Sequence, residues 1–159
     1  MGEAAAAGWT LHLNRPDGGL LPSQKLRQGV ALVLEEEGVQ DGELSITFLE
    51  DDPIRELNRR YLNHDWVPDV LSFPLHQDGY PLHGDIYVGL GQAARQATEH
   101  GVPLEEELVR LSVHGVLHVL GYDHPEDMAS RRASSLYRIQ ERVVRKVFSG
   151  DGLTGGDPR

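Results

Sequence analysis

The sequence of 159 residues contains no cysteine, and this absence removes a whole class of chemistry. Without thiols the chain forms no disulfide and offers no thiolate to a metal, so any metal must rest on His, Asp or Glu. The chain also has no apolar run near the roughly 20 residues that span a bilayer, and its alanine-rich start lacks the basic and apolar regions of a signal peptide. We therefore expect a cytoplasmic protein that does not enter a membrane.

Positive charge is scarce as well. The chain holds 15 Lys and Arg against 25 Asp and Glu, a formal net charge of −10. This balance argues against broad, nonspecific binding of nucleic acid, which depends on many contacts between cations and phosphates. A local basic patch stays open, because one stretch sets only Glu141 against a run of cations: Arg131, Arg132, Arg138, Arg142, Arg145 and Lys146. The alternative is the solvated face of a terminal helix.

Local patterns predict alternating strands and helices. Alternation and β-branched residues predict strands at 9–14, 44–50, 69–73 and 85–90. Helical spacing predicts helices at 23–38, 51–62, 92–98, 104–120 and 125–147. Ser23 is expected to cap the first of these helices, and Asp52, before Pro53, the second.

This order of elements predicts an α+β fold of one domain over residues 9–148. We expect a small mixed sheet of about four strands, packed by helices on one side, with a metal site on a central helix. No repeat or linker divides the chain. The two ends, residues 1–8 and 149–159, have little to bury and are expected to be disordered tails.

The stretch "HGVLHVLGYDH", residues 114–124, carries the clearest chemical signal. His114 and His118 are four residues apart on the apolar 104–120 helix, so their imidazoles share one face and can converge on one ion. Gly121 is a natural helix stop, after which the chain can reverse and bring His124 over the same face. Three protein ligands with an open position are the catalytic pattern for zinc. A hydrogen-bonded core histidine is the plainer interpretation of any one of these residues, but the cluster favours metal.

The same spacing occurs in metzincin-type zinc proteases, with one difference. In those enzymes the residue after the first histidine is a glutamate, which takes a proton from the metal-bound water. Here that residue is Gly115. The sequence therefore keeps the ligand geometry without the base, which argues against peptide hydrolysis by that route.

The whole stretch resembles the signature of the YbeY family, bacterial metal-dependent endoribonucleases linked to rRNA maturation. "DVLSFP" at 69–74 and "HGDIYV" at 83–88 are similar to two further motifs of that family, in the same order, and the resemblance covers residues 10–147. It implies a single zinc ion held by His114, His118 and His124. It also implies single-stranded RNA as substrate and ribosomal subunits as partners.

The chain departs from the family at one position. The family usually has an arginine directly after the tyrosine that precedes "DVLSFP", and that arginine is thought important for activity. Here Tyr61 is followed by Leu62. Arg59 or Arg60 could supply the cation from another angle on the helix, and a solvated helix face is the alternative for each.

We therefore predict a zinc-dependent endoribonuclease that cleaves single-stranded RNA in rRNA processing and ribosome biogenesis. The catalytic candidates are His114, Asp123, Arg59 and Arg60. Asp123 could equally orient an imidazole from the turn. Two other functions stay open: a non-catalytic ribosome-assembly factor with a structural zinc, and a zinc hydrolase acting on another substrate such as a peptide.

One motif suggests a different ligand. "GLGQAA" at 89–94 fits a dinucleotide fingerprint after a strand and at the start of a helix. That fingerprint needs a βαβ unit with an acidic residue about 20 positions on. A helix is expected to follow instead, so we interpret these glycines as a strand-to-helix turn and expect no dinucleotide.

Overall fold

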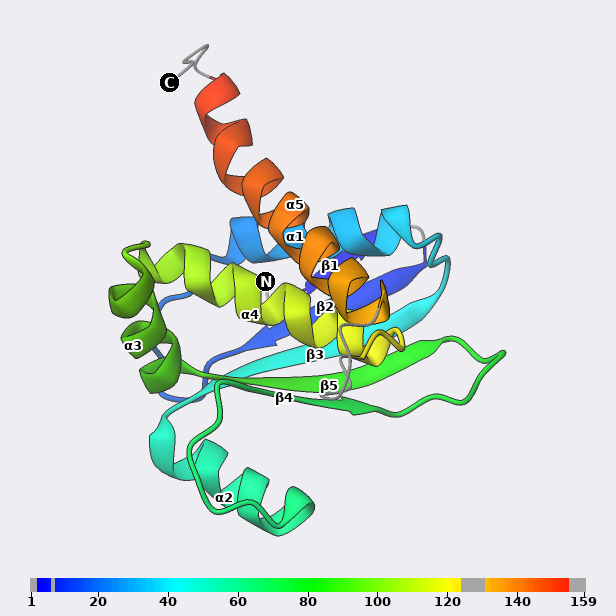
Figure 1. Ribbon diagram of the computed structural model, residues 1–159. Helices are drawn as coiled ribbons and strands as arrows, with labels where there is room; N and C mark the ends of the chain where they lie inside the picture. The colour runs from blue at the N-terminus through cyan, green and yellow to red at the C-terminus, as the bar shows by residue number, and fades with distance from the viewer. Residues whose placement is uncertain (1–2, 7, 124–130, 155–159) are drawn as a thin grey trace.

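The computed structural model describes residues 3–6, 8–123 and 131–154 (Figure 1). The strands are β1 (Glu3–Ala6), β2 (Trp9–Asn14), β3 (Gly42–Leu49), β4 (Val70–Pro74) and β5 (Leu82–Gly89). The helices are α1 (Ser23–Glu36), α2 (Asp51–Leu62), α3 (Leu90–His100), α4 (Leu104–Val119) and α5 (Arg131–Thr154). No helix in the described part of the chain is both long and apolar enough to cross a membrane.

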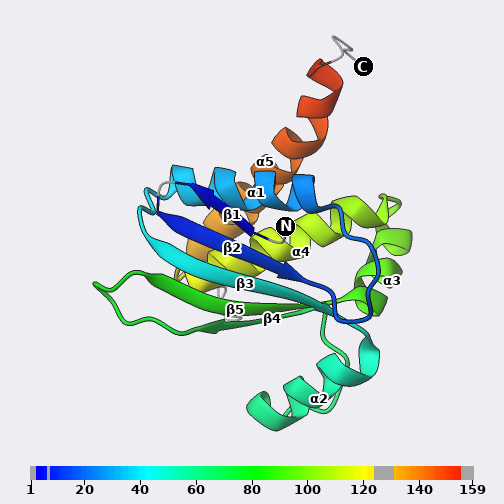
Figure 2. The same ribbon diagram turned by 180° about the vertical axis from the view of Figure 1, so that it is seen from behind.

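The five strands form one mixed sheet in the order β1-β2-β3-β5-β4 (Figure 2). β2, β3 and β5 run parallel, while β1 and β4 pair antiparallel at the two edges. The α+β fold is confirmed, with a strand more than expected. Residues 3–6 form the extra strand where the sequence suggested a disordered tail. Three of these four residues are alanine, which is depleted in strands and carries little pattern from which to predict one.

Helices α1, α4 and α5 cover one face of the sheet (Figures 1 and 2). The strand residues facing them are apolar and buried, among them Leu11, Ile46 and Ile86. α2 lies on the opposite side of the sheet, so the expectation that all helices share one side was wrong for this element (Figure 1). The buried residues of α2 are Ile54 and Asn58, and the amide of Asn58 donates to the carbonyl of Trp66 in the segment that follows.

Helix limits follow the sequence closely, with differences at the caps. Pro22 rather than Ser23 is the N-cap of α1, and Glu50 rather than Asp52 is the N-cap of α2. Both predicted capping side chains lie one or two residues inside the helix, where Asp52 still suits the positive end of the helix dipole. At the far end, α5 continues to Thr154, into the range expected to be a tail. The expected start of this helix at residues 125–130 lies outside the described residues.

The glycine-rich turn at the start of α3 has a structural explanation. β5 passes directly into α3 at Leu90, and a Cβ atom on Gly91 would collide with the carboxylate of Asp51. That carboxylate accepts hydrogen bonds from Arg95 of α3 at 3.2 and 3.3 Å. Gly91 therefore makes room for an ion pair between α2 and α3.

Helix α4 is the buried centre of the helical layer, and two glycines let it lie close to β5. A Cβ atom on Gly115 would stand 2.6 Å from Cγ2 of Ile86, and one on Gly84 would stand 2.6 Å from Cγ1 of Val119. The side chain of each element thus fills the gap left by a glycine of the other. After α4 the chain turns at Gly121, whose φ of 106° is the positive value expected of a helix stop.

Candidate metal centre and its cleft

The structure brings two of the three predicted ligands together at the end of α4. The Nε2 atoms of His114 and His118 lie 3.0 Å apart, and the two rings meet edge to face with centroids 4.6 Å apart. This arrangement follows from the helical repeat, because residues four apart stand one above the other on one face. Both nitrogens therefore point to a shared position.

The third predicted ligand, His124, lies outside the described residues. Within the described residues no group of three His, Asp or Glu side chains could hold a metal, so the metal centre stays a prediction. Asp123, the residue before His124, is exposed and lines a cleft together with His114 and His118.

The pair can be tested against the geometry that zinc requires. Zn–N distances of about 2.0–2.1 Å in a tetrahedron set two nitrogen ligands roughly 3.3 Å apart. The separation of 3.0 Å between the two Nε2 atoms is close to this value. Neutral imidazoles are also ligands that zinc prefers. The two histidines therefore fit two ligand positions of a tetrahedral zinc site.

A cleft of about 540 Å³ opens beside the two histidines. Strand β4 forms one wall, the end of α4 and the turn after it form another, and the end of α2 closes a third. The lining residues are Leu62, Asp69, Val70, Leu71, Ser72, Pro74, His114, His118, Gly121, Tyr122 and Asp123. Since β4 is an edge strand, this cleft lies open at the rim of the sheet.

A hydrogen bond joins strand β4 to the part of α4 that lies between the two histidines. Ser72 donates its hydroxyl proton to the carbonyl of Gly115, with 3.3 Å between the oxygens. Asp69, just before the strand, accepts hydrogen bonds from its neighbour Val70 and from Gln96 of α3. Both residues hold the cleft wall in place.

The arginines predicted to grip phosphate lie elsewhere. Arg59 donates two hydrogen bonds to Glu56, at 2.6 and 3.0 Å, and Arg60 stands 3.5 Å from the same carboxylate. Neither residue lines the cleft, whereas Leu62 does. The hydrogen bonds to Glu56 also raise the pKa of Arg59 and lower the pKa of Glu56. The catalytic role of either arginine stays a prediction.

A buried glutamine holds the first histidine from α5. Gln140, 7% exposed, lies with Oε1 2.7 Å from Nδ1 of His114. Its Nε2 donates to Glu141 at 2.9 Å, and Glu141 in turn accepts hydrogen bonds from Arg110 at 2.8 and 3.1 Å. Sequence analysis missed this partner, because nothing in the pattern of α5 shows which residue faces His114.

Arg110 is the centre of an ionic cluster at the other end of this chain of contacts. It also donates to Glu106 and Glu107 of its own helix, each at 2.9 Å. Burial alone would lower the pKa of Arg110, but the hydrogen bonds to these carboxylates raise it above its usual range. Burial likewise tends to raise the pKa of Glu141, and hydrogen bonds from Arg110 and Gln140 hold it below its usual value. Arg110 and Glu141 are therefore both charged at neutral pH.

The basic stretch on α5 fits the interpretation as the solvated face of a terminal helix. The side chains of Arg138, Arg142, Arg145 and Lys146 are exposed, and Arg142 forms an ion pair with Glu36 of α1. The side chains of Arg131 and Arg132 lie outside the described ones.

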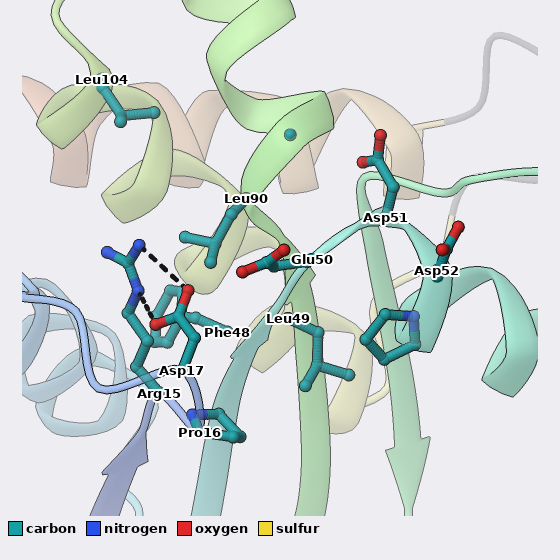
Figure 3. A pocket seen from close by; sticks show the side chains of 12 residues that line it. Arg15, Pro16, Asp17, Phe48, Leu49, Glu50, Asp51, Asp52, Leu90 and Leu104 are labelled. Carbon is teal, nitrogen blue, oxygen red and sulfur yellow. Dashed lines mark hydrogen bonds and ion pairs between the residues drawn. The ribbon is translucent and has the colours of Figure 1, made fainter.

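A second cavity, of about 790 Å³, opens where β2, β3 and β5 end (Figure 3). Its lining includes four carboxylates, Asp17, Glu50, Asp51 and Asp52, among apolar side chains such as Phe48 and Leu90. Arg15 binds Asp17 at 2.8 Å on its rim and so leaves the wall acidic (Figure 3). It contains none of the predicted site residues.

Fold and site together define a class: an α+β protein of one mixed sheet whose buried central helix presents a histidine pair to an open cleft. A family model described as Endoribonuclease YbeY matches residues 21–147. The chain belongs to the YbeY family of endoribonucleases.

Individual relatives agree. The chain is 40% identical over 136 residues to the Endoribonuclease YbeY of Thermus thermophilus, covering 82% of this chain and 93% of that protein. It is 35% identical over 128 residues to that of Persephonella marina, covering 78% and 82%. The solution structure of a Thermotoga maritima protein, 28% identical, superposes with a TM-score of 0.61 over 92% of this chain and 93% of that one.

Proposed function

We propose that this protein is a zinc-dependent endoribonuclease that cleaves phosphodiester bonds of single-stranded RNA in the cytoplasm, in rRNA processing and ribosome biogenesis. The observation that carries the proposal is the pair of Nε2 atoms, 3.0 Å apart in the wall of an open cleft. The name endoribonuclease, borne by its relatives, supports RNA as the substrate.

In this proposal His114, His118 and His124 hold one zinc ion. A zinc ion bound by three neutral imidazoles supplies a Lewis acid and a water of lowered pKa. The chain's own residues then position RNA: β4 supplies one wall, and Asp123 is close enough along the chain to accept a proton or orient an imidazole.

The close packing of Gly115 counts against the peptidase alternative. A glutamate in that position takes the proton in zinc proteases of this spacing. Here a side chain at position 115 would collide with Ile86. The position therefore has no room for the base, while RNA carries a nucleophile of its own in the 2′-hydroxyl.

Two exposed aromatic side chains lie in α2 and in the segment that follows it, outside the lining of the cleft. Tyr61 is 61% exposed and packs edge to face on Phe73 of β4. The side chain of Phe73 lies on the face of the sheet opposite to that of Ser72, which contacts α4. Trp66, 56% exposed, stacks on His64 in the segment that leads from α2 to β4. Unpaired bases stack on such rings, whereas a duplex keeps its bases stacked on one another.

The assembly-factor alternative has two observations in its favour. Leu62 brings an apolar side chain to the cleft where the family usually has a cation, and the chain as a whole is acidic. A non-catalytic factor would bind ribosomal subunits equally well after loss of the metal ligands. An enzyme would lose cleavage.

One experiment separates these outcomes. Metal content and RNA cleavage are measured together for the wild type and His118→Ala, with a chelator added to a parallel sample. We expect about one zinc per wild-type chain, cleavage that the chelator abolishes, and loss of both in the variant. Zinc-loaded protein that leaves single-stranded RNA intact, or a variant that cleaves equally well, would overturn the proposal.

A further inference from the structure

We propose that Gln140 of α5 is a positioning residue that fixes the tautomer of His114 and so directs its Nε2 lone pair at the metal position. The inference rests on the zinc site proposed above. Its evidence is a chain of hydrogen bonds from Arg110 through Glu141 and Gln140 to His114, in which every direction of donation is determined.

The chain begins at Arg110, which can only donate. Its guanidinium nitrogens lie 2.8 and 3.1 Å from the two carboxylate oxygens of Glu141, so this carboxylate is an acceptor. Two further carboxylates, Glu106 and Glu107, hold the guanidinium from α4. The first link is thus a charged pair whose roles cannot be exchanged.

The next link orients the amide of Gln140. The nitrogen and oxygen of an amide can exchange places by a flip, so its contacts decide its orientation. Oε2 of Glu141 lies 2.9 Å away and can only accept, which requires the NH₂ group of Gln140 on that side. The carbonyl oxygen of Gln140 must then face His114.

The last link sets the imidazole. Oε1 of Gln140 lies 2.7 Å from Nδ1 of His114, and because this oxygen has no proton, Nδ1 must donate. In a neutral imidazole the other nitrogen, Nε2, then carries the lone pair. That nitrogen is the one 3.0 Å from Nε2 of His118. The tautomer that a metal requires is therefore selected by a residue on another helix.

Burial makes this selection effective. Gln140 is 7% exposed, and the side chains of Arg110 and Glu141 are 19% and 21% exposed. Water competes little for these groups, so an amide turned the wrong way would set its oxygen against the carboxylate of Glu141, two acceptors with no proton between them. Hydrogen-bond partners of metal-binding histidines commonly change metal affinity roughly 10- to 100-fold when removed.

The test uses metal-free full-length protein with ¹⁵N-labelled histidine, at about pH 8, above the ordinary imidazole pKa of about 6.5. Long-range ¹H–¹⁵N spectra report which ring nitrogen carries the proton. We expect His114 protonated on Nδ1 in the wild type. We expect a shift toward the Nε2–H tautomer in Gln140→Leu, with zinc affinity, measured by competition with a chelator, reduced roughly 10- to 100-fold.

Three further variants make the outcome specific. Gln140→Met replaces the carbonyl oxygen with a thioether sulfur, which is only a weak acceptor, is unbranched, and serves if the leucine variant does not fold. Gln140→Glu keeps an acceptor, so His114 should remain protonated on Nδ1. Arg142→Gln removes an ion pair between α5 and α1 and should change neither readout, which separates the tautomer from the docking of α5.

The proposal is overturned if His114 stays protonated on Nδ1 in folded Gln140→Leu or Gln140→Met, or if these variants bind zinc within twofold of the wild type. A wild type that binds no zinc would instead overturn the proposed function. The tautomer spectra would still decide the role of Gln140, because they are recorded without metal.

Discussion

Gly115 lies so close to Ile86 that the glycine position has no space for a side chain: a Cβ atom would stand 2.6 Å from Cγ2 and 3.3 Å from Cγ1 of the isoleucine. This contact fixes how near α4 lies to the sheet. It also accounts for the glycine between the two histidines as a requirement of packing.

Gly115→Ala should therefore destabilise the fold although alanine is the better helix former. Overpacking typically costs about 1–3 kcal/mol, against a gain of about 1 kcal/mol in helix propensity. We expect a net loss on the order of 1 kcal/mol in the free energy of unfolding, measured by urea denaturation.

The matched control is the same substitution in an Ile86→Ala background. There the space above the glycine is open, so the added methyl group should be neutral or stabilising. An equal cost in both backgrounds would show that the contact with Ile86 is not the cause.

Leu62→Arg should increase RNA cleavage. The side chain at 62 already lines the cleft, so an arginine there would bring a cation to the substrate phosphates. One charge-assisted contact is worth about 1.5–3 kcal/mol, which corresponds to roughly a tenfold or greater rise in kcat/KM. Leu20→Arg, at a position 90% exposed outside the cleft, adds the same charge and should give little change. An equal rise in both variants would point to overall charge.

Tyr61→Ala should weaken the binding of single-stranded RNA without removing zinc. Loss of one stacked base costs about 1–3 kcal/mol, or roughly a five- to hundredfold rise in Kd. Tyr61→Phe keeps the ring and should bind nearly as well. Tyr137→Ala removes a similarly exposed tyrosine from α5 and is the control for a general effect. Unchanged binding in Tyr61→Ala would exclude this ring as a stacking platform.

Glu141→Gln should lower the free energy of unfolding at neutral pH. It should also make that free energy less dependent on pH in the acid range. The folded-state pKa of Glu141 lies below its unfolded value of about 4.3. Its contribution is therefore fully present above the unfolded pKa and is lost as pH falls through the folded pKa. We expect a difference of about 1–3 kcal/mol between wild type and variant, constant above about pH 5.5 and shrinking below about pH 4.

Unfolding free energies measured across this pH range provide the check. Glu99→Gln changes an exposed carboxyl on α3 that lies outside the Arg110 cluster, and should give little difference at any pH. A difference for Glu141→Gln that does not shrink in acid would mean that its carboxylate charge is not what stabilises the cluster.

Local periodicity was enough to predict most of the elements. The spacing of apolar residues gave α4 within about a residue at its end, and alternation gave β2 at its observed limits. The strand at Glu3–Ala6 was missed because its pairing with β2, rather than its own residues, makes it a strand. The face of the sheet on which α2 packs was also missed, because the local sequence of a helix does not show to which face the chain crosses after β3.

Contacts of the site within one helix were predictable from the sequence. Contacts between two helices were not. Four residues of helical spacing bring His114 beside His118 in any α-helix. The contact of His114 with Gln140 joins residues 26 positions apart and depends on how α5 crosses α4. No local pattern contains that crossing, and the same holds for Leu62 in the wall of the cleft.

The contact between α4 and α5 has a consequence for the order of synthesis. His114 and His118 emerge from the ribosome first, and Gln140 follows about two dozen residues later. Until α5 has emerged and packed, the first histidine lacks the partner that sets its protonation. In a nascent chain, therefore, the histidine pair is present before the residue that holds His114 in the folded protein.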